Sequence, residues 1–293
     1  MSDLSLPTTA RLITGSRWRP WRFLSRHVTI LVGSTLFTVL VLLSILAPLI
    51  SPFDPIALDV VHRLRPPNAV HWFGTDAYGR DVLSRTLYGG RISLVVGVAA
   101  ASLSAVIGTV IGLLAGMFRW VDAIAMRIMD GLMAIPSILL AVAMMSLARP
   151  GVLTVVVAIT VPEVPRIVRL VRSVVLSIRE QPYVQAATSI GTRMPRLLWR
   201  HVLPNALTPI IVQATYVCAS AVLLESYLGF LGVGIPPETP SWGNIIADGR
   251  TYVQLAIWII LFPGFFLGAM VMSINMLGDG VRDLLDPRLA RRL

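Results

Sequence analysis

The sequence predicts an all-α integral membrane protein with six transmembrane helices and with both termini in the cytoplasm. Two properties of the composition point to lipid as the solvent: hydrophobic residues make up 55% of the 293 residues and charged residues only 14%. The mean hydropathy of +0.76 agrees with them. A water-soluble domain with this composition would expose a very large apolar surface. Apolar runs long enough to cross a bilayer, flanked by arginines, are the third observation.

Six apolar runs are the predicted spans, and they cover residues 28–50, 92–118, 121–147, 152–170, 207–228 and 253–277. The first run follows a basic segment, as in a signal peptide. Because it is longer than the roughly 7–15 residues of a signal-peptide core, we interpret it as an uncleaved span, with a cleaved signal as the alternative.

Loop charge predicts the orientation. Arginine exceeds acidic residues in the tail 1–27, in the loop at about 172–205 and in the tail 281–293, which indicates that these segments are cytoplasmic. The long loop 51–90 is nearly neutral and is expected outside. Residues 91–280, between the outer loop and the C-terminal tail, are then expected to form the main membrane domain.

Small residues recur at every fourth position of the second span, at Ala100, Ser104, Gly108, Gly112 and Gly116. This spacing favours close contact with another helix, although such pairs also arise by chance in membrane helices.

Among the charged residues inside predicted spans, four are candidate pathway or structural charges, and each costs about 2.5–3.5 kcal/mol at a helix centre. Arg127 and Asp130 are three positions apart, so we expect them to pair on one face. Glu163 lies between two prolines that are expected to break the fourth span, and Arg166 follows it. This segment is predicted either to line a pathway through the membrane or to form a local ion pair.

Several kinds of chemistry are disfavoured by residue usage. The 25 basic residues are all arginine, which excludes a phosphate-loop or Schiff-base lysine. Cys218 is the sole cysteine, and the four histidines are scattered. The sequence therefore predicts no catalytic, metal or cofactor site in this chain. Its net charge of +10 flanks apolar runs rather than covering a polar face, which argues against nucleic acid.

A short helix is predicted in the loop after the fourth span. Pro182 suits the first helical position and Gly191 the position after the C-terminus, which gives a helix of about nine residues and roughly 13 Å. Tyr183, Ala187 and Ile190 are expected to share one apolar face that fits a groove on a partner protein. A helix resting on lipid headgroups is the alternative.

A second short helix is expected to start near Pro195, with Arg196 and Arg200 on one side. Leu203, Pro204 and Asn205 then lead back into the membrane.

This loop resembles the "EAA" loop of binding-protein-dependent ABC importer permeases. The resemblance rests on Gln185-Ala186-Ala187, with Gln in place of the usual Glu, on Gly191 and on Leu203-Pro204. Further motifs are similar to the second, C-type permease of the dipeptide, oligopeptide and nickel group. They are Phe73-Gly74-Thr75-Asp76, Gly79-Arg80-Asp81, Tyr227-Leu228-Gly229-Phe230-Leu231-Gly232, Pro240-Ser241-Trp242-Gly243 and Leu277-Gly278-Asp279-Gly280.

The resemblance implies a type I ABC importer permease fold in the bacterial inner membrane. It implies a B-type permease as heterodimer partner, two cytoplasmic ATPase subunits that bind ATP and Mg, and an extracytoplasmic solute-binding protein. The loop helix would couple to one ATPase, and the residues implied in coupling are Tyr183, Gln185, Ala186, Ala187, Ile190, Gly191, Leu203 and Pro204.

Peptides are the substrates that the resemblance implies, with a nickel chelate or glutathione as alternatives. Two other classes stay open. A secondary transporter would need inverted repeats and a coupling-ion site, and a membrane enzyme would need a clustered acid, base or metal constellation.

Overall fold

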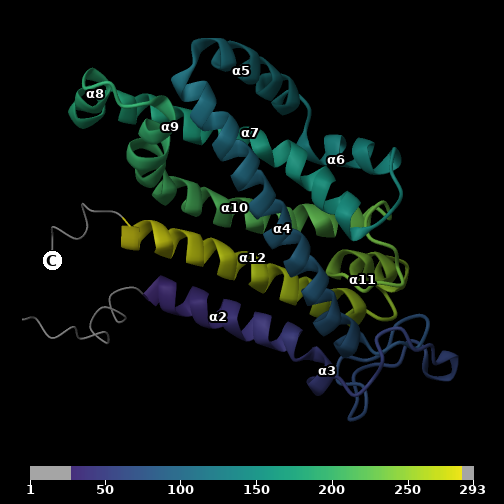
Figure 1. The fold of residues 1–293 in the computed structure, drawn as a ribbon. Coiled ribbons are helices and arrows are strands. Elements are labelled where there is room, and N and C mark those ends of the chain that lie inside the picture. The colour runs from purple at the N-terminus through teal and green to yellow at the C-terminus, as the bar shows by residue number, and fades with distance from the viewer. Residues whose placement is uncertain (1–27, 286–293) are drawn as a thin grey trace, which may run out of the picture.

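The computed structural model describes residues 28–285, which are helical apart from connecting loops and one isolated bridge between Thr75 and Asp81. Helices α2 (Val28–Ile45) and α3 (Ala47–Ile50) precede a long loop, and α4 (Val82–Met117) is the central helix. The helices that follow are α5 (Arg119–Met133), α6 (Ser137–Ser146), α7 (Val152–Arg179), α8 (Pro182–Ser189), α9 (Met194–Leu197), α10 (Leu203–Phe230), α11 (Trp242–Gly249) and α12 (Trp258–Leu285) (Figure 1).

Four segments are long and apolar enough to cross a membrane: Val28–Ile45, Val82–Met117, Met194–Phe230 and Trp258–Leu284. A fifth is possible if α5 and α6 form one broken span, since they are bent by 88° at their junction. The prediction of one straight helix over residues 121–147 is therefore wrong. The break lies at Pro136, because the ring of a proline disfavours helical geometry at the residue before it.

Helix α7 runs without interruption through Pro162 and Pro165, so the predicted break in the fourth span is also wrong. Both prolines are buried. Helix α7 packs along α4 and also contacts α10, and neighbouring helices stabilise a membrane helix in which proline has removed backbone hydrogen bonds.

The small-residue stripe of α4 lies against α7, and the predicted close helix contact is confirmed. A Cβ built on Gly108 would lie 2.7 Å from the Cβ of Ile167, and one on Gly116 would lie 2.5 Å from Cγ1 of Val175. Ser104 Oγ donates to the carbonyl of Thr160 at 3.4 Å. Helix α7 can approach α4 this closely because α4 presents only glycine, alanine and serine along this face.

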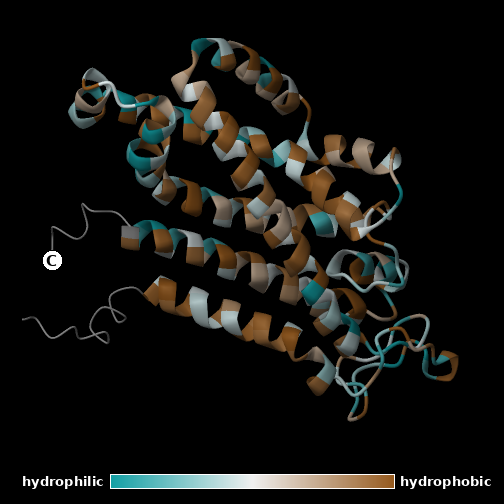
Figure 2. Cartoon of the chain, viewed as in Figure 1, coloured by the Kyte–Doolittle hydropathy of each residue, from teal (hydrophilic) through white to brown (hydrophobic). Residues whose placement is uncertain are grey.

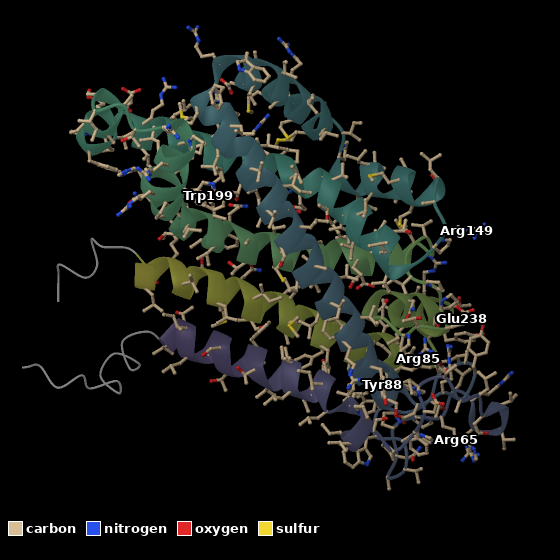
Figure 3. All side chains as sticks on the ribbon, viewed as in Figure 1. Arg65, Arg85, Tyr88, Arg149, Trp199 and Glu238 are labelled. Carbon is tan, nitrogen blue, oxygen red and sulfur yellow. The ribbon has the colours of Figure 1, made fainter. Side chains whose placement is uncertain are left out.

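The two ends of the molecule differ in character. The start of α2, the end of α12 and α8 lie at one end, and α11 lies at the other with the loop between α3 and α4 (Figure 1). Hydrophobic residues run along α2, α4 and α10, whereas hydrophilic residues are frequent around α8 and in that loop (Figure 2). Figure 3 labels Trp199 near the α8 end and Arg85 at the opposite end.

The loop before α4 is held by a network of charges around buried Asp76. Arg80 Nε donates to Asp76 Oδ2 at 2.6 Å, and Arg80 Nη2 donates to Asp248 Oδ2 of α11 at 2.9 Å. Arg85, which is 1% exposed, reaches Asp248 at 3.4 Å. Three charges of the nearly neutral loop 51–90, on Asp76, Arg80 and Arg85, therefore join Asp248 in one network, which connects α11 to the N-terminal end of α4.

Glycine explains the turn that carries this network. Gly79 has φ +76°, and a Cβ there would lie 1.7 Å from the carbonyl oxygen of Asp59. Only glycine fits this position. On the same loop, His62 hydrogen-bonds Asp59 at 2.6 Å, which lowers the pKa of the exposed Asp59 carboxyl.

Candidate coupling site

Helix α8 and the segments that flank it form the candidate coupling site. Pro182 occupies the first turn after Gln181, as predicted. At the other end, the N–H of Gly191 donates to the carbonyl of Thr188 at 3.0 Å, and the N–H of Thr192 donates to that of Ala187 at 3.0 Å. This pair of bonds is a Schellman motif, and Gly191 adopts the left-handed φ of +78° that the motif requires. The predicted helix bounds are confirmed.

The predicted apolar face is wrong in one member. Ala187 is 7% exposed and packs with Val184 in the same cluster as Val175 and Leu197 of its own chain. Tyr183 and Ile190, by contrast, are 44% and 83% exposed. Tyr183 and Ile190 are therefore the large apolar side chains that α8 exposes, while Val184 and Ala187 anchor α8 to the ends of α7 and α9.

Tyr183 and Gln185 connect α8 to the adjoining helices. Asn205 Nδ2 donates to the Tyr183 hydroxyl at 3.2 Å and to the carbonyl of His201 at 2.7 Å. Gln185 Nε2 donates to the carbonyl of Glu180 at 3.3 Å, at the end of α7. A glutamate at this position could not donate that bond. The Gln in the motif thus has a structural use in this chain.

The return to the membrane is continuous rather than looped. Helix α9 passes through a π turn at Leu198–Val202 directly into α10, which begins at Leu203 with Pro204 in its first turn. Leu203, Pro204 and Asn205, which were expected to lead back into the membrane, form the first turn of α10.

Three side chains of this region were missed by the sequence analysis as possible contacts. Val184 is buried. The only sequence feature that could have indicated this was its position one helical turn before Thr188. Trp199 is 73% exposed and lies near α8 (Figure 3). Met194, the first residue of α9, is 38% exposed. A tryptophan between arginines was the signal for Trp199.

Two of the predicted intramembrane charges pair as expected and two do not. Glu163 Oε2 accepts from Arg166 Nη1 at 3.2 Å, so that ion pair is confirmed. Asp130 pairs at 2.6 Å with Arg169 of α7 instead of with Arg127, and Arg127 has no ion pair within residues 28–285. The i, i+3 interaction is weak, and α5 lies against α7, so the interhelical partner is preferred.

A buried carboxyl that the sequence analysis did not single out lies in α10. Glu225 is 1% exposed and accepts a hydrogen bond from Ser93 Oγ of α4 at 2.7 Å. Glu225 lies in α10, just before the Tyr227-Leu228-Gly229 motif. This part of α10 packs against Gly243 of α11, where a Cβ would lie 2.5 Å from the carbonyl oxygen of Ser226. These motif residues therefore have a packing role.

Comparison with known proteins gives two family matches. Residues 108–291 match the family described as binding-protein-dependent transport system inner membrane component, and residues 16–67 match the N-terminal TM domain of oligopeptide transport permease C.

Named relatives align over most of the chain. A probable peptide ABC transporter permease of Sinorhizobium fredii is 51% identical, covering 92% of this chain and 93% of the relative. The dipeptide transport permease DppC of Alkalihalophilus pseudofirmus is 42% identical, covering 92% and 90%. The oligopeptide permease OppC of Bacillus subtilis is 38% identical, covering 92% and 88%.

A solved structure has the same fold. A chain of the inward-facing MetNI methionine ABC transporter superposes with a TM-score of 0.58 at 22% identity, covering 69% of this chain and 96% of that chain.

Proposed function

The chain belongs to the family of binding-protein-dependent transport system inner membrane components, and we propose that it forms half of the translocation pathway of an ATP-driven peptide importer. The observation that carries this proposal is the alignment of relatives named as peptide, dipeptide and oligopeptide permeases over 92% of the chain. The chain is an integral membrane protein of the permease class. We propose that it has no ATPase site of its own.

The proposed topology has six crossings with the α8 end in the cytoplasm. The bent pair α5 and α6 supplies one crossing, and α7 supplies another, since its 28 residues extend roughly 42 Å. The common location of α8, the start of α2 and the end of α12 supports this assignment (Figure 1). The arginine excess of the adjoining segments supports the cytoplasmic side for that end.

Helix α8 is proposed to dock into a cleft of a cytoplasmic ATPase subunit. Tyr183 and Ile190 would enter the cleft, because both are exposed, Tyr183 in the first turn of α8 and Ile190 at its C-terminal cap. Burial of Val184 and Ala187 supports a coupling role, since a force applied to α8 would reach α7 through packed side chains. A helix on lipid headgroups is the competing proposal.

The partners follow from the same family assignment. We propose a B-type permease as the other half of the pathway, two ATPase subunits that bind ATP and Mg, and an extracytoplasmic solute-binding protein. The loop before α4 and helix α11 offer a rigid surface on the outer side for that protein, because the Asp76 network holds them together.

The test is uptake by the assembled complex in proteoliposomes, with the solute-binding protein added outside and ATP enclosed. We expect uptake of a dipeptide or oligopeptide only when ATP and the binding protein are both present. Uptake driven by an ion gradient without ATP would indicate a secondary transporter instead. Uptake of a nickel chelate or glutathione, but not of peptides, would reassign the substrate.

A further inference from the structure

Helices α7 and α10 share a partly exposed polar face. Arg166 lies at the midpoint of α7, and its side chain is 46% exposed. On α10, Gln213, Tyr216 and Ser220 recur at helical spacing and are only partly buried, and Tyr227 continues the stripe with 49% exposure. A cation held at the middle of a membrane helix must face protein or water, because exposure to the bilayer core is costly.

The guanidinium of Arg166 is fixed at one nitrogen. Its Nη1 donates to Glu163 Oε2 at 3.2 Å and to Ser220 Oγ of α10 at 3.3 Å. Glu163 is itself buried, with 1% of its side chain exposed, so the pair is anchored from inside the helix bundle. No described residue accepts a hydrogen bond from Nε or Nη2 of Arg166. The donors on that edge form the planar fork that matches a carboxylate.

We infer that Arg166 binds the C-terminal carboxylate of a peptide as it passes along this face of α7 and α10. The inference rests on the proposed function and specifies the substrate group that the pathway recognises. Charge complementarity selects the occupant, because a peptide carries a carboxylate and the open edge of Arg166 carries paired N–H donors. The neighbouring carboxylate of Glu163 offsets part of the positive charge, which keeps the contact weak enough for the substrate to leave.

The first test asks whether this face is wet and attracts anions. In a Cys218→Ser background, Ser220→Cys places a thiol beside Arg166 in the assembled complex in membranes. We expect an anionic thiosulfonate to modify this thiol faster than a cationic one of similar size, by a factor on the order of ten. Adding Arg166→Gln should abolish the preference, whereas Arg169→Gln, which removes an equal charge from the same helix, should leave most of it.

Two outcomes would overturn the inference. If neither reagent reaches Ser220→Cys, the face is covered by lipid or by the second permease rather than by a water-filled path. If the anion preference survives Arg166→Gln, another group creates it. Because labelling does not depend on uptake, failure of this test is distinguishable from failure of the proposed peptide import.

The second test measures transport. Arg166→Gln should lower dipeptide uptake at saturating binding protein on the order of tenfold, and Arg166→Lys should restore only part of it, because lysine keeps the charge but loses the planar fork. Loading of the binding protein and co-purification of the ATPase subunits are measured in parallel and should match the wild type. Unchanged uptake in Arg166→Gln would refute the role of Arg166.

Discussion

Gly112 of α4 lies directly against Val171 of α7: a Cβ built on Gly112 would be 2.7 Å from the Cβ of Val171 and 3.0 Å from the carbonyl oxygen of Val168. We expect Gly112→Ala to destabilise the chain by about 1–3 kcal/mol, because the neighbouring backbone cannot yield easily. The matched control is Gly131→Ala in α5, where a Cβ would meet nothing within 4 Å and helix propensity improves by about 1 kcal/mol. Thermal inactivation in detergent measures the stability of each variant. Equal stability of Gly112→Ala and Gly131→Ala would contradict the prediction.

Asp76 should be essential to the fold of the outer loop. Asp76→Ala removes the acceptor for Arg80 Nε and for the backbone N–H groups of Tyr78 and Arg80, so we expect a loss of about 3–5 kcal/mol. The measurement is trypsin cleavage of the loop from the outer side in spheroplasts. Asp54→Ala, at an exposed position of the same loop, should leave the cleavage rate unchanged. A resistant loop in Asp76→Ala would show that the network is dispensable.

The left-handed conformation of Gly191 should be required for the exit from α8. Gly191→Val would meet a backbone cost of about 1–2 kcal/mol and no steric clash, since nothing lies within 4 Å of a Cβ there. Gly191→Asn is the control, because asparagine tolerates this conformation. We expect transport to fall in Gly191→Val more than subunit abundance does, and to be retained in Gly191→Asn. Similar transport by Gly191→Val and Gly191→Asn would show that transport does not depend on the left-handed conformation at this position.

Substitutions at Ile190 and at Ala187 should affect different quantities: co-purification of the ATPase subunits for Ile190, and abundance of the chain for Ala187. Ile190→Asp alters an exposed tip, so the chain should accumulate normally while co-purifying less of the ATPase subunits. Ala187→Trp overfills a buried site in the chain itself, so abundance should fall first. Quantifying the chain and the ATPase in one purification separates the two effects. Normal co-purification in Ile190→Asp would favour the headgroup-bound alternative for α8.

The proposed topology predicts which side of the membrane each end of the molecule faces. In a Cys218→Ser background, Thr192→Cys beside α8 should react with a membrane-impermeant thiol reagent only from the cytoplasmic side. Val70→Cys, at a 63% exposed position in the loop before α4, should react only from outside. Labelling of Thr192→Cys from outside, in intact cells, would contradict the six-crossing arrangement. Ser16, in the N-terminal tail, lies outside the described residues but should behave like Thr192.

Local rules predicted the elements that depend on local chemistry. Pro182 and Gly191 specified α8 because proline fits a first turn and glycine fits a left-handed φ, and both effects act within a few residues. The stripe of small residues on α4 likewise predicted a close helix contact. The sequence did not say that α7 would be the helix in contact, since every apolar span offers a similar surface to lipid.

Tertiary contacts decided the features that the sequence analysis missed. Pro162 and Pro165 do not break α7, because packing against α4 and α10 outweighs the lost backbone bonds. Asp130 pairs with Arg169 and not with Arg127 for a similar reason: the neighbouring helix α7 places Arg169 within ion-pair distance of Asp130. Ala187 was misplaced because an eight-residue helix has two apolar sides, and only its contact with α9 and the end of α7 reveals which one is buried.

The unbroken course of α7 makes it a rigid rod between the two ends of the molecule. It begins at Val152 and ends beside α8, and Arg166 lies midway along it. A tilt of about 10° at the α8 end would move the Val152 end by roughly 7 Å, given its length of roughly 42 Å. Arg166 would shift by about half as much, together with Glu163. A small angular change at α8 would thus become a displacement larger than a hydrogen bond at the middle of α7, without any change in the helix itself.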